Sequence, residues 1–456
     1  MKDWPVNPGE QHNALITRLL SVIPALAVIA VVASSYIARS PDIIAARVYG
    51  GPPGPDDTVA WRVVVALHDR GFYEPVPRLP VSIETQFSPP VEGTTDDEGA
   101  WEARVPLPSR PEQVEITVRR RDSNTVLLHG LVPLHPPSWN ASFRRASPHM
   151  SGRRDGSLQV DLFLLRGTIA SSFPERALVR VSRSHGPVPA ARLVLTGDGM
   201  TFRPSNAPVT DAEGRAKVTL VTTFPSPTLE IHATDAEGQT GSFECALPVR
   251  TGAMWIDPDK LAHNAIVVAS PVGHHHAYLT VFNEQARLFA ARLPLTRDDA
   301  GGATGTMPLP SLPAGGTWVM ASPDPQGTGS ETDLLAWPIA SSTDVPAEAA
   351  HVSTPMLGDG MPTARAAAKR RAHAGRLRAL LILSVAALLE AGLIGLRARS
   401  ARRELEHLIA SQIDMDETVS RALMGGSRFW LKMLIATFLI AIAFGALAFV
   451  TWLGAA

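Results

Sequence analysis

The residues with the most specific potential chemistry are three consecutive histidines: His274, His275 and His276. Neutral imidazole is a common ligand of zinc and copper, so this cluster suggests a metal site. Adjacent residues of a strand point to opposite faces, however, so regular structure cannot bring three consecutive rings to one ion. Pro271 and Gly273 come just before the cluster and favour an exposed loop, which is the interpretation we prefer.

A short acidic motif, Asp-x-Glu-Gly, could supply oxygen ligands to calcium, which takes roughly six to eight of them. The motif occurs as Asp96–Gly99, Asp211–Gly214 and Asp235–Gly238. A β-turn explains the same pattern more simply, because Asp is favoured where a turn opens and Gly where it closes. We therefore interpret the motif as a turn between strands and expect no cofactor.

The sequence holds none of the common catalytic signatures: no G-x-S-x-G elbow, no H-E-x-x-H, no P-loop and no G-x-G-x-x-G. We accordingly predict no catalytic residues and no enzymatic activity. The net charge of −1 gives no basic excess for nucleic acid. Cys245 is the single cysteine, so no intramolecular disulfide can form, and it shares a strand face with Phe243 and Leu247 that predicts a core position.

Three stretches are long and apolar enough to cross a bilayer, which takes about 20 residues. They are residues 19–38, 379–396 and 429–453. The first follows a predicted cytoplasmic N-terminus, residues 1–18, and could instead be a cleaved signal peptide. Its apolar core is longer than the roughly 7–15 residues of such peptides, which favours an uncleaved anchor.

The distribution of basic residues predicts the orientation of these spans. Residues 397–428, expected to form an amphipathic helix, carry several arginines, so we place them in the cytoplasm. A second basic group, between 369 and 378, lies on the opposite side of the second span. We discount it because long domains are translocated largely regardless of charge, and we predict that the residues between the first two spans lie outside the cytoplasm.

One acidic residue, Glu390, falls inside the second span. A carboxylate at membrane depth needs a partner or a watery cavity. Lys432, at the matching end of the third span, can extend its side chain inward. We predict a Glu390–Lys432 pair that joins the two helices. The alternative is that Glu390 faces the seam of a homo-oligomer formed through the membrane helices.

Residues 43–345 alternate between apolar and polar positions in the manner of β-strands, and blocks of this sequence recur. PVPRLPVSIET recurs as PVPAARLVLTG, TTDDEGAWEARVPL as VTDAEGRAKVTL, and QVEITVRR as TLEIHATD, with a weaker third copy of the last block from Thr317. We therefore predict three β-sandwiches at 43–150, 151–250 and 254–345, followed by a linker at 346–378.

The run RVYGGPPGPDDTVAWRVVV, followed by a Pro-Val strand and a T-D-x-E-G turn, resembles the macroglobulin-type immunoglobulin-like modules of bacterial envelope proteins. The resemblance covers the β-rich region and implies a sandwich fold. The Cys-Gly-Glu-Gln thioester tetrapeptide of trapping macroglobulins is absent, and Cys245 stands in ECALP instead. The resemblance therefore implies no trapping chemistry.

Together these features predict a mainly β fold with three tandem immunoglobulin-like β-sandwiches and three transmembrane α-helices. We predict a membrane-anchored, non-enzymatic protein of the bacterial inner membrane, with the sandwiches in the periplasm or outside the cell. The expected partners are the lipid bilayer and an envelope protein or glycan. The alternative is an accessory subunit of a membrane transport or assembly complex, acting through its transmembrane hairpin.

Overall fold

A computed structural model gives the fold of the chain. It describes residues 18–20, 22–33, 43–69, 72–108, 111–136, 144–299, 301–312, 316–325, 336–339, 349–351 and 354–411, and also residues 435, 438, 442, 443, 445 and 446. The chain divides into two compact units, one of residues 44–364 and one of residues 1–43 with 365–456, which we call the β unit and the helical unit. Each is described by itself.

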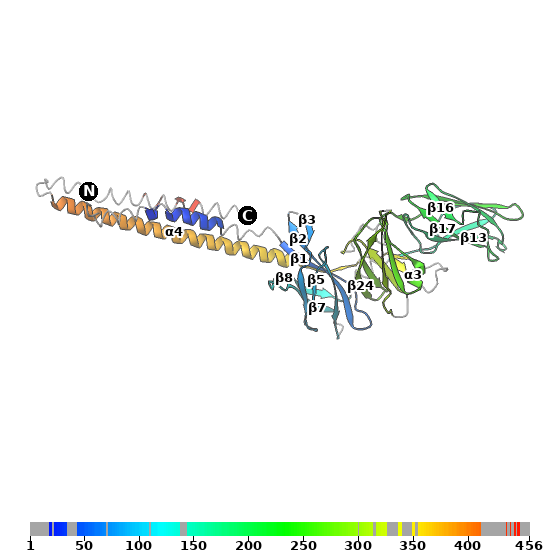
Figure 1. Cartoon of the computed structure of the whole chain (residues 1–456), viewed down its shortest axis with the longest axis horizontal. Coiled ribbons are helices and arrows are strands. Elements are labelled where there is room, and N and C mark those ends of the chain that lie inside the picture. The colour runs from blue at the N-terminus through cyan, green and yellow to red at the C-terminus, as the bar shows by residue number, and fades with distance from the viewer. Residues whose placement is uncertain are drawn as a thin grey trace. The chain divides into compact units, whose positions relative to one another are not determined.

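The strands of the β unit form pairs of sheets around three hydrophobic clusters, called core 1, core 2 and core 3 in chain order (Figure 1). These strands confirm the prediction of a mainly β chain. Their sequence pattern explains them: in β18 (Thr228–Thr234), buried Leu229, Ile231 and Ala233 alternate with exposed residues. Such alternation buries one face of a strand and leaves the other in solvent.

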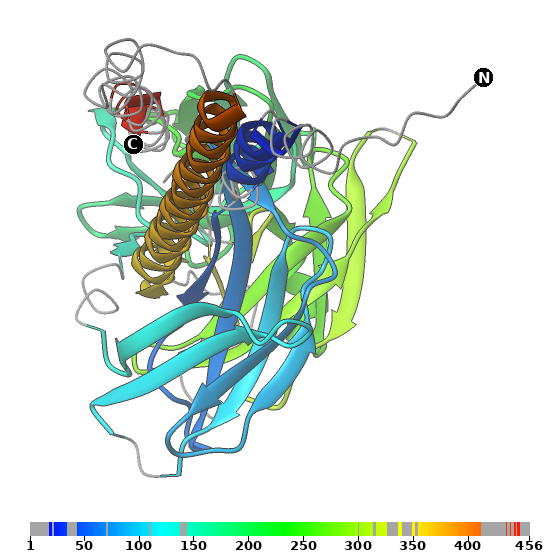
Figure 2. The same ribbon diagram turned by 90° about the vertical axis from the view of Figure 1, so that its left-hand side faces the viewer.

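Core 1 lies between two sheets, visible in blue and cyan in Figure 2. The first has the order β3 (Phe72–Pro75), β2 (Thr58–Asp69), β1 (Ile43–Tyr49), β30 (Met356–Asp359), with β6 (Ala100–Pro106) also paired to β2. The second has the order β5 (Val91–Thr94), β4 (Pro80–Thr85), β7 (Gln113–Arg120), β8 (Val126–Pro133).

Core 2 is enclosed in the same way. One sheet has the order β10 (Arg153–Gly156), β19 (Thr240–Ala246), β18, β15 (Arg192–Thr196). The other has the order β11 (Gln159–Leu164), β13 (Glu175–Arg183), β17 (Arg215–Thr222), β16 (Met200–Arg203), with β14 (Gly186–Pro187) on β13. A short parallel pair, β12 (Ile169–Ala170) with β20 (Val249–Arg250), stands beside them.

Core 3 has one sheet of β21 (Trp255–Ile256), β22 (Ala265–Ser270), β26 (Ala303–Pro308) and β25 (Thr296–Arg297), with the short helix α3 (Pro258–Ala262) between β21 and β22. Its other sheet has the order β24 (Arg287–Pro294), β23 (His276–Phe282), β27 (Trp318–Ser322), β28 (Ala336–Pro338), β29 (Ala349–His351), β9 (Arg144–Ala146).

Strand pairing is equivalent around the three cores. One sheet of each contains an antiparallel pair, β2–β6, β13–β17 or β22–β26. The opposite sheet contains the trio β4–β7–β8, β15–β18–β19 or β23–β27–β28. These correspond to the B–E pair and the C–F–G trio of the immunoglobulin fold, so the sheets are immunoglobulin-like in topology.

The β unit begins and ends in the same sheet. β1 pairs antiparallel with β30, with Arg47 opposite Asp359 and Val48 opposite Gly358. Between these strands the chain contributes β9 to a core 3 sheet before it forms core 2, and it forms the rest of core 3 afterwards. The chain therefore leaves core 1 and returns to it.

The structure differs from the predicted linker at 346–378. This segment contributes β29, β30 and the first turns of α4 (Met361–Ser411). The strands escaped prediction because they have three and four residues, too few to show a period. At the start of the helix, the Asp359 carboxylate accepts a hydrogen bond from the Met361 amide at 3.0 Å, and the Gly360 carbonyl accepts one from the Ala364 amide at 2.9 Å.

α4 is continuous through the predicted second span and into the predicted helix at 397–428. Its stretch Met361–Glu404 is, in the described part of the chain, the one helix long and apolar enough to cross a membrane. Described residues of the first predicted span are helical, and Val31 packs against Ala379 and Leu383 of α4. Most of the third predicted span, 429–453, lies outside the described residues, as do all of residues 412–428.

Cys245 lies in β19 inside core 2, as its strand face predicted. Burial, reinforced by the neighbouring Glu244 charge, raises the pKa of its thiol to about 11. At pH 8 only about one thiol in a thousand is then ionised, and the thiolate is the reactive form. We expect Cys245 to react with an aromatic disulfide reagent at least about 100-fold more slowly in the native chain than in urea. Equal rates in both states would show that core 2 opens readily.

Candidate functional site

The most elaborate polar cluster in the described residues lies where a core 1 sheet meets a core 3 sheet. Strand β23 is buried along its whole length, and Val59–Val65 of β2 is buried as well. A strand buried on both faces is covered by a second layer on each side. Arg62 in β2 and Arg287 in β24 are each 1% exposed, so both charges depend on partners inside the protein.

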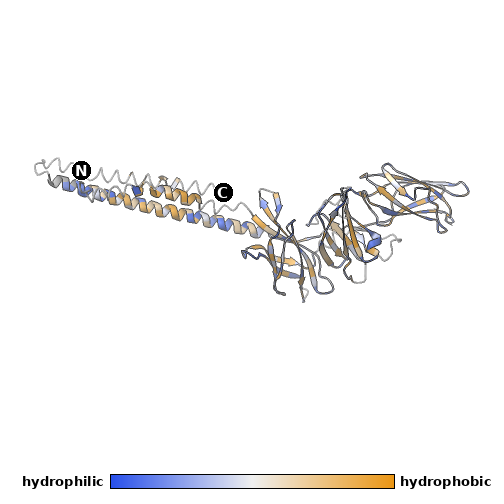
Figure 3. Ribbon diagram, viewed as in Figure 1, coloured by the Kyte–Doolittle hydropathy of each residue, from blue (hydrophilic) through white to orange (hydrophobic). Residues whose placement is uncertain are grey.

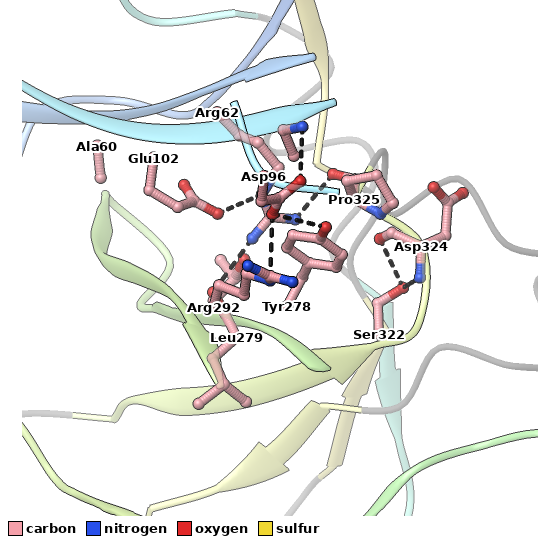
Figure 4. A network of polar contacts seen from close by, with 12 residues as sticks. Ala60, Arg62, Asp96, Glu102, Tyr278, Leu279, Arg292, Ser322, Asp324 and Pro325 are labelled. Atoms are coloured by element: carbon pink, nitrogen blue, oxygen red, sulfur yellow. Dashed lines mark hydrogen bonds and ion pairs between the residues drawn. The ribbon is translucent and has the colours of Figure 1, made fainter. Parts of the chain in front are cut away.

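Arg62 is held from three directions (Figure 4). Its Nε donates a short hydrogen bond to Glu102 of β6. Nη1 donates to the Pro325 carbonyl at 2.9 Å, and Nη2 donates to the Leu279 carbonyl at 3.3 Å. The guanidinium also lies 5.0 Å from the centre of the Tyr278 ring. One core 1 side chain therefore satisfies two backbone carbonyls of core 3.

Arg287 makes the reciprocal contact. Its Nη1 donates to the Ala60 carbonyl of β2 at 2.5 Å, and Nη2 lies 3.7 Å from Glu102 Oε2. Complete burial, with Arg62 nearby, lowers the pKa of Arg287 to about 10, and the Glu102 charge opposes that shift. Glu102 is thus the acid that lies between two buried arginines.

The turn after β5 completes the cluster. Asp96 Oδ1 accepts hydrogen bonds from the Glu98 and Ala100 amides, both at 2.9 Å, which fixes the turn. Its other oxygen accepts from the Tyr278 hydroxyl at 2.9 Å and lies 3.3 Å from Arg292 Nε (Figure 4). The same carboxylate therefore shapes a turn of core 1 and binds core 3.

These groups border a cavity of about 220 Å³. Its lining is mixed, with acidic, basic and aromatic side chains: Thr94, Asp96, Ala100, Trp101, Glu102, Tyr278 and Arg292. The space is enough for about seven waters at their liquid volume. Both carboxylates are engaged by arginines. The Tyr278 hydroxyl contacts the Asp96 carboxylate, but burial and that negative charge raise the pKa of Tyr278 and so disfavour a phenolate nucleophile. The arrangement suits a joint between two sheets better than a catalytic centre.

The structure places the three histidines in different environments: His274 is half-buried, His275 is exposed and His276 is buried. His274 and His275 precede β23, and His276 is its first residue. His276 Nδ1 accepts a hydrogen bond from Arg292 Nη2 at 3.1 Å, because a guanidinium can only donate. Burial and the Arg292 charge lower the pKa of His276, which favours this neutral form. No group of three or more metal-ligating side chains occurs within the described part of the chain.

The acidic motifs are turns. In Asp211–Gly214, Asp211 Oδ1 accepts from the Glu213 and Arg215 amides at 3.0 and 2.8 Å. Gly99, Gly214 and Gly238 have φ values of +69°, +68° and +82°, a region that favours glycine. A fourth such turn, which the sequence motif missed, opens with Asp298, whose Oδ1 accepts from the Gly302 amide at 2.8 Å. The motif missed this turn because the turn has no glutamate.

The structure describes one of the two residues of the predicted membrane pair. Glu390 lies in α4 and is 4% exposed. Its Oε1 is buried without a hydrogen-bond partner among the described residues. Lys432 lies outside the described residues, so the Glu390–Lys432 pair stays a prediction.

A second buried ion pair joins core 2 to core 3. Arg166 Nη2 lies 2.7 Å from Glu175 Oε2, with the two side chains 8% and 1% exposed. Arg166 Nη1 also donates to the Ile256 carbonyl at 3.2 Å, and its guanidinium lies 4.2 Å from the Trp337 ring centre. Desolvation raises the pKa of Glu175, against the opposing Arg166 charge.

Sequence reasoning named none of these arginines. A signal was present in β2, where Arg62 interrupts the otherwise apolar run Val59–Val65. A single charged residue inside a run too apolar to alternate indicates a strand that is buried on both faces and carries a buried charge. Arg287 stands in a mixed segment, QARLFAARLP, and gave no comparable signal.

Comparisons with known proteins give no family model and no curated relative that matches. Solved structures do match at low identity. The D0-D1 domain of intimin is 15% identical over 45% of this chain and 97% of that one, with a TM-score of 0.15. Invasin, titled a bacterial integrin-binding protein, is 14% identical over 62% of this chain and 57% of that one, with a TM-score of 0.17. FdeC, an Escherichia coli adhesin, is 15% identical over 62% and 92%, with a TM-score of 0.18.

With TM-scores this far below 0.5, the assignment of an immunoglobulin-like β-sandwich fold rests on the strand pairing within this chain. That pairing is shared by many sandwich families, so the macroglobulin-type resemblance stays a prediction.

Proposed function

We propose that this chain is a membrane-anchored, non-enzymatic protein of the bacterial inner membrane. In this proposal three tandem immunoglobulin-like modules, one for each core, bind or scaffold an envelope protein or a glycan outside the cytoplasm. The pairing of β1 with β30 carries the proposal, because it brings both ends of the β unit into one sheet. The apolar helix α4 begins two residues after β30, and the first apolar segment ends a few residues before β1.

A β unit that is anchored to one membrane at both ends needs those ends to lie close together. If residues 19–38 and 379–396 both cross the bilayer, the β unit must start and finish near the same membrane surface. A single file of modules with its ends far apart would strain one of the two anchors. The return of the chain to core 1 removes that conflict and leaves the surfaces of cores 2 and 3 for recognition.

The polar joints support scaffolding over catalysis. Arg62 and Arg287 tie core 1 to core 3, and Arg166 ties core 2 to core 3, each through buried charge-assisted contacts. Such contacts have strict geometry and favour a fixed arrangement of modules. A fixed arrangement suits a protein that presents surfaces at defined positions.

A labelling experiment on the full chain tests the location. In a variant with Cys245→Ala and a new cysteine at exposed Glu213, intact spheroplasts are treated with a membrane-impermeant thiol reagent. We expect labelling before lysis, which places the turn at Glu213 outside the cytoplasmic membrane. Labelling only after lysis would put the β unit in the cytoplasm and overturn the proposal. The Cys245→Ala chain without the new cysteine reports background.

A second function, as an accessory subunit of a membrane complex, is favoured by one observation. The Oε1 of Glu390, in the apolar stretch of α4, is buried and has no partner among the described residues, which is costly unless it contacts another group in the membrane. If the helical unit alone replaces the full chain in cells, this second function is supported over the first.

A further inference from the structure

The segment of α4 that precedes its apolar stretch carries a dense positive charge. The segment contains Arg365 and, nearer the apolar stretch, five more lysine or arginine residues: Lys369, Arg370, Arg371, Arg376 and Arg378. No aspartate or glutamate occurs between Asp359 and Glu390. The charge is therefore not balanced by acids along the helix itself.

The helix distributes these side chains around its axis. At about 100° per residue, positions 369, 370 and 371 point in three directions, and 376 and 378 lie within about 20° of 369 and 371. Lys369, Arg370, Arg371 and Arg378 are exposed, and none of these four has an ion pair with an acid among the described residues. These five residues, which we call the collar, extend about 14 Å along the axis and about 220° around it.

The collar adjoins the apolar stretch directly. Ala379 follows Arg378, and the hydrophobic segment of α4 continues to Leu396 (Figure 3). If that stretch spans the hydrocarbon, the collar stands at the level of the lipid headgroups, where flexible basic side chains reach phosphates over more than half of the helix circumference. Arginine binds phosphate through paired N–H donors, and basic segments beside a span favour anionic lipid.

We propose that this collar binds the phosphates of anionic phospholipids in the leaflet that faces the β unit. The inference rests on the proposed membrane anchoring and adds the class of lipid and the residues that select it. The opposite end of the stretch is different: Arg397, Arg399, Arg402 and Arg403 are followed by Glu404 and Glu406, and Arg402 pairs with Glu406 at 2.9 Å. That end has its own acids, so the collar is the stronger anion site.

The test uses the full chain purified in mild detergent. Phosphatidylglycerol and phosphatidylcholine of identical acyl chains are added in turn, and bound lipids are counted by native mass spectrometry. We expect the chain to bind phosphatidylglycerol about tenfold or more tightly than phosphatidylcholine. Changing all five collar residues to glutamine should remove most of that preference. Changing the four collar arginines to lysine should retain it, because the charge remains.

A matched control removes the same charge from the β unit. Five exposed arginines around core 2 are changed to glutamine in one variant: Arg153, Arg180, Arg192, Arg203 and Arg215. This variant should keep the preference. The Glu213→Cys label confirms that each variant has unchanged topology.

Two results overturn the inference. One is equal binding of both lipids by the unaltered chain, and the other is a preference that survives in the glutamine collar variant. In both cases the chain still partitions into detergent, so membrane anchoring stands. A chain found in the aqueous phase without detergent would instead refute the anchoring and the collar together.

Discussion

Replacing Glu102 by alanine is expected to lower the free energy of unfolding of the chain by about 3–5 kcal/mol, because it removes the acid from a buried ionic cluster. Glu102 is 17% exposed and lies between Arg62 and Arg287, which are 1% and 0% exposed at their side chains. Without it, two guanidinium groups face each other in the interior. Their backbone carbonyl partners satisfy hydrogen bonds but carry no compensating full charge.

The measurement is urea unfolding of the full chain in mild detergent, followed by tryptophan emission, since Trp61 lies beside Arg62 in core 1. Glu92→Ala is the matched control, because Glu92 pairs with Arg121 at 2.9 Å on the surface, with both side chains about half exposed. Exposed pairs contribute about 0–1 kcal/mol. Equal losses in the two variants would mean that the buried cluster is not a stabilising joint.

The stability deficit of Glu102→Ala depends on pH with a defined sign. Burial lowers the pKa of Arg287 to about 10, so the folded state disfavours its charged form. A base with a lowered folded pKa gains stability as pH rises through that value toward its unfolded value. Loss of the Glu102 charge must lower the Arg287 pKa further, so the deficit of Glu102→Ala should be largest at neutral pH and narrow as the pH rises toward 10. Arg62→Met in the same variant should restore part of the loss at neutral pH, because one of the two unpaired charges is gone.

Periodicity was sufficient to predict the strands of the repeated blocks and the equivalence of those blocks. The blocks beginning at Gln113, Thr228 and Thr317 became β7, β18 and β27, which occupy the same position in their sheets. Local patterns suffice there because each strand buries one face and each Asp-Gly turn satisfies its own amides. Alternation says nothing, however, about which sheets pack against one another.

For that reason the sequence could not predict the buried polar contacts between cores or the return of the chain to core 1. β30 has four residues, and its pairing with β1 joins positions more than 300 residues apart. Arg62 and Pro325 are 263 residues apart, Arg287 and Ala60 are 227 apart, and no local pattern links them. A sequence can reveal that a charge such as Arg62 must be buried, but the partner depends on how whole sheets are placed.

Removing one partner of the Arg166–Glu175 pair is expected to lower the free energy of unfolding by about 3–5 kcal/mol. Replacing both partners by apolar residues is expected to lower it by about 1 kcal/mol or less. Arg166→Met leaves Glu175, which is 1% exposed, without its cation. Glu175→Leu leaves a buried guanidinium with the Ile256 carbonyl as its remaining acceptor. The double variant Arg166→Met/Glu175→Leu leaves neither charge, so it should be close to the unaltered chain.

A neighbouring pair provides the control. Arg176 and Asp259 bridge β13 and α3 at 2.6 Å, but their side chains are 34% and 54% exposed. Arg176→Met should therefore cost less than about 1 kcal/mol. A loss for Arg166→Met that is no larger than for Arg176→Met would contradict the role assigned to burial.

The single variant Arg166→Met should also depend on pH in a way that the double variant does not. Desolvation already raises the pKa of Glu175, and loss of the opposing Arg166 charge must raise it further. An acid with a raised folded pKa favours folding most at low pH, and this contribution is lost as pH rises through the folded value. The free energy of unfolding of Arg166→Met should thus be closest to that of the unaltered chain near pH 4. It should become progressively lower than that of the unaltered chain as the pH approaches 8. Because the double variant lacks Glu175, its difference from Arg166→Met across this range measures the free energy of ionising that one carboxyl group inside the joint.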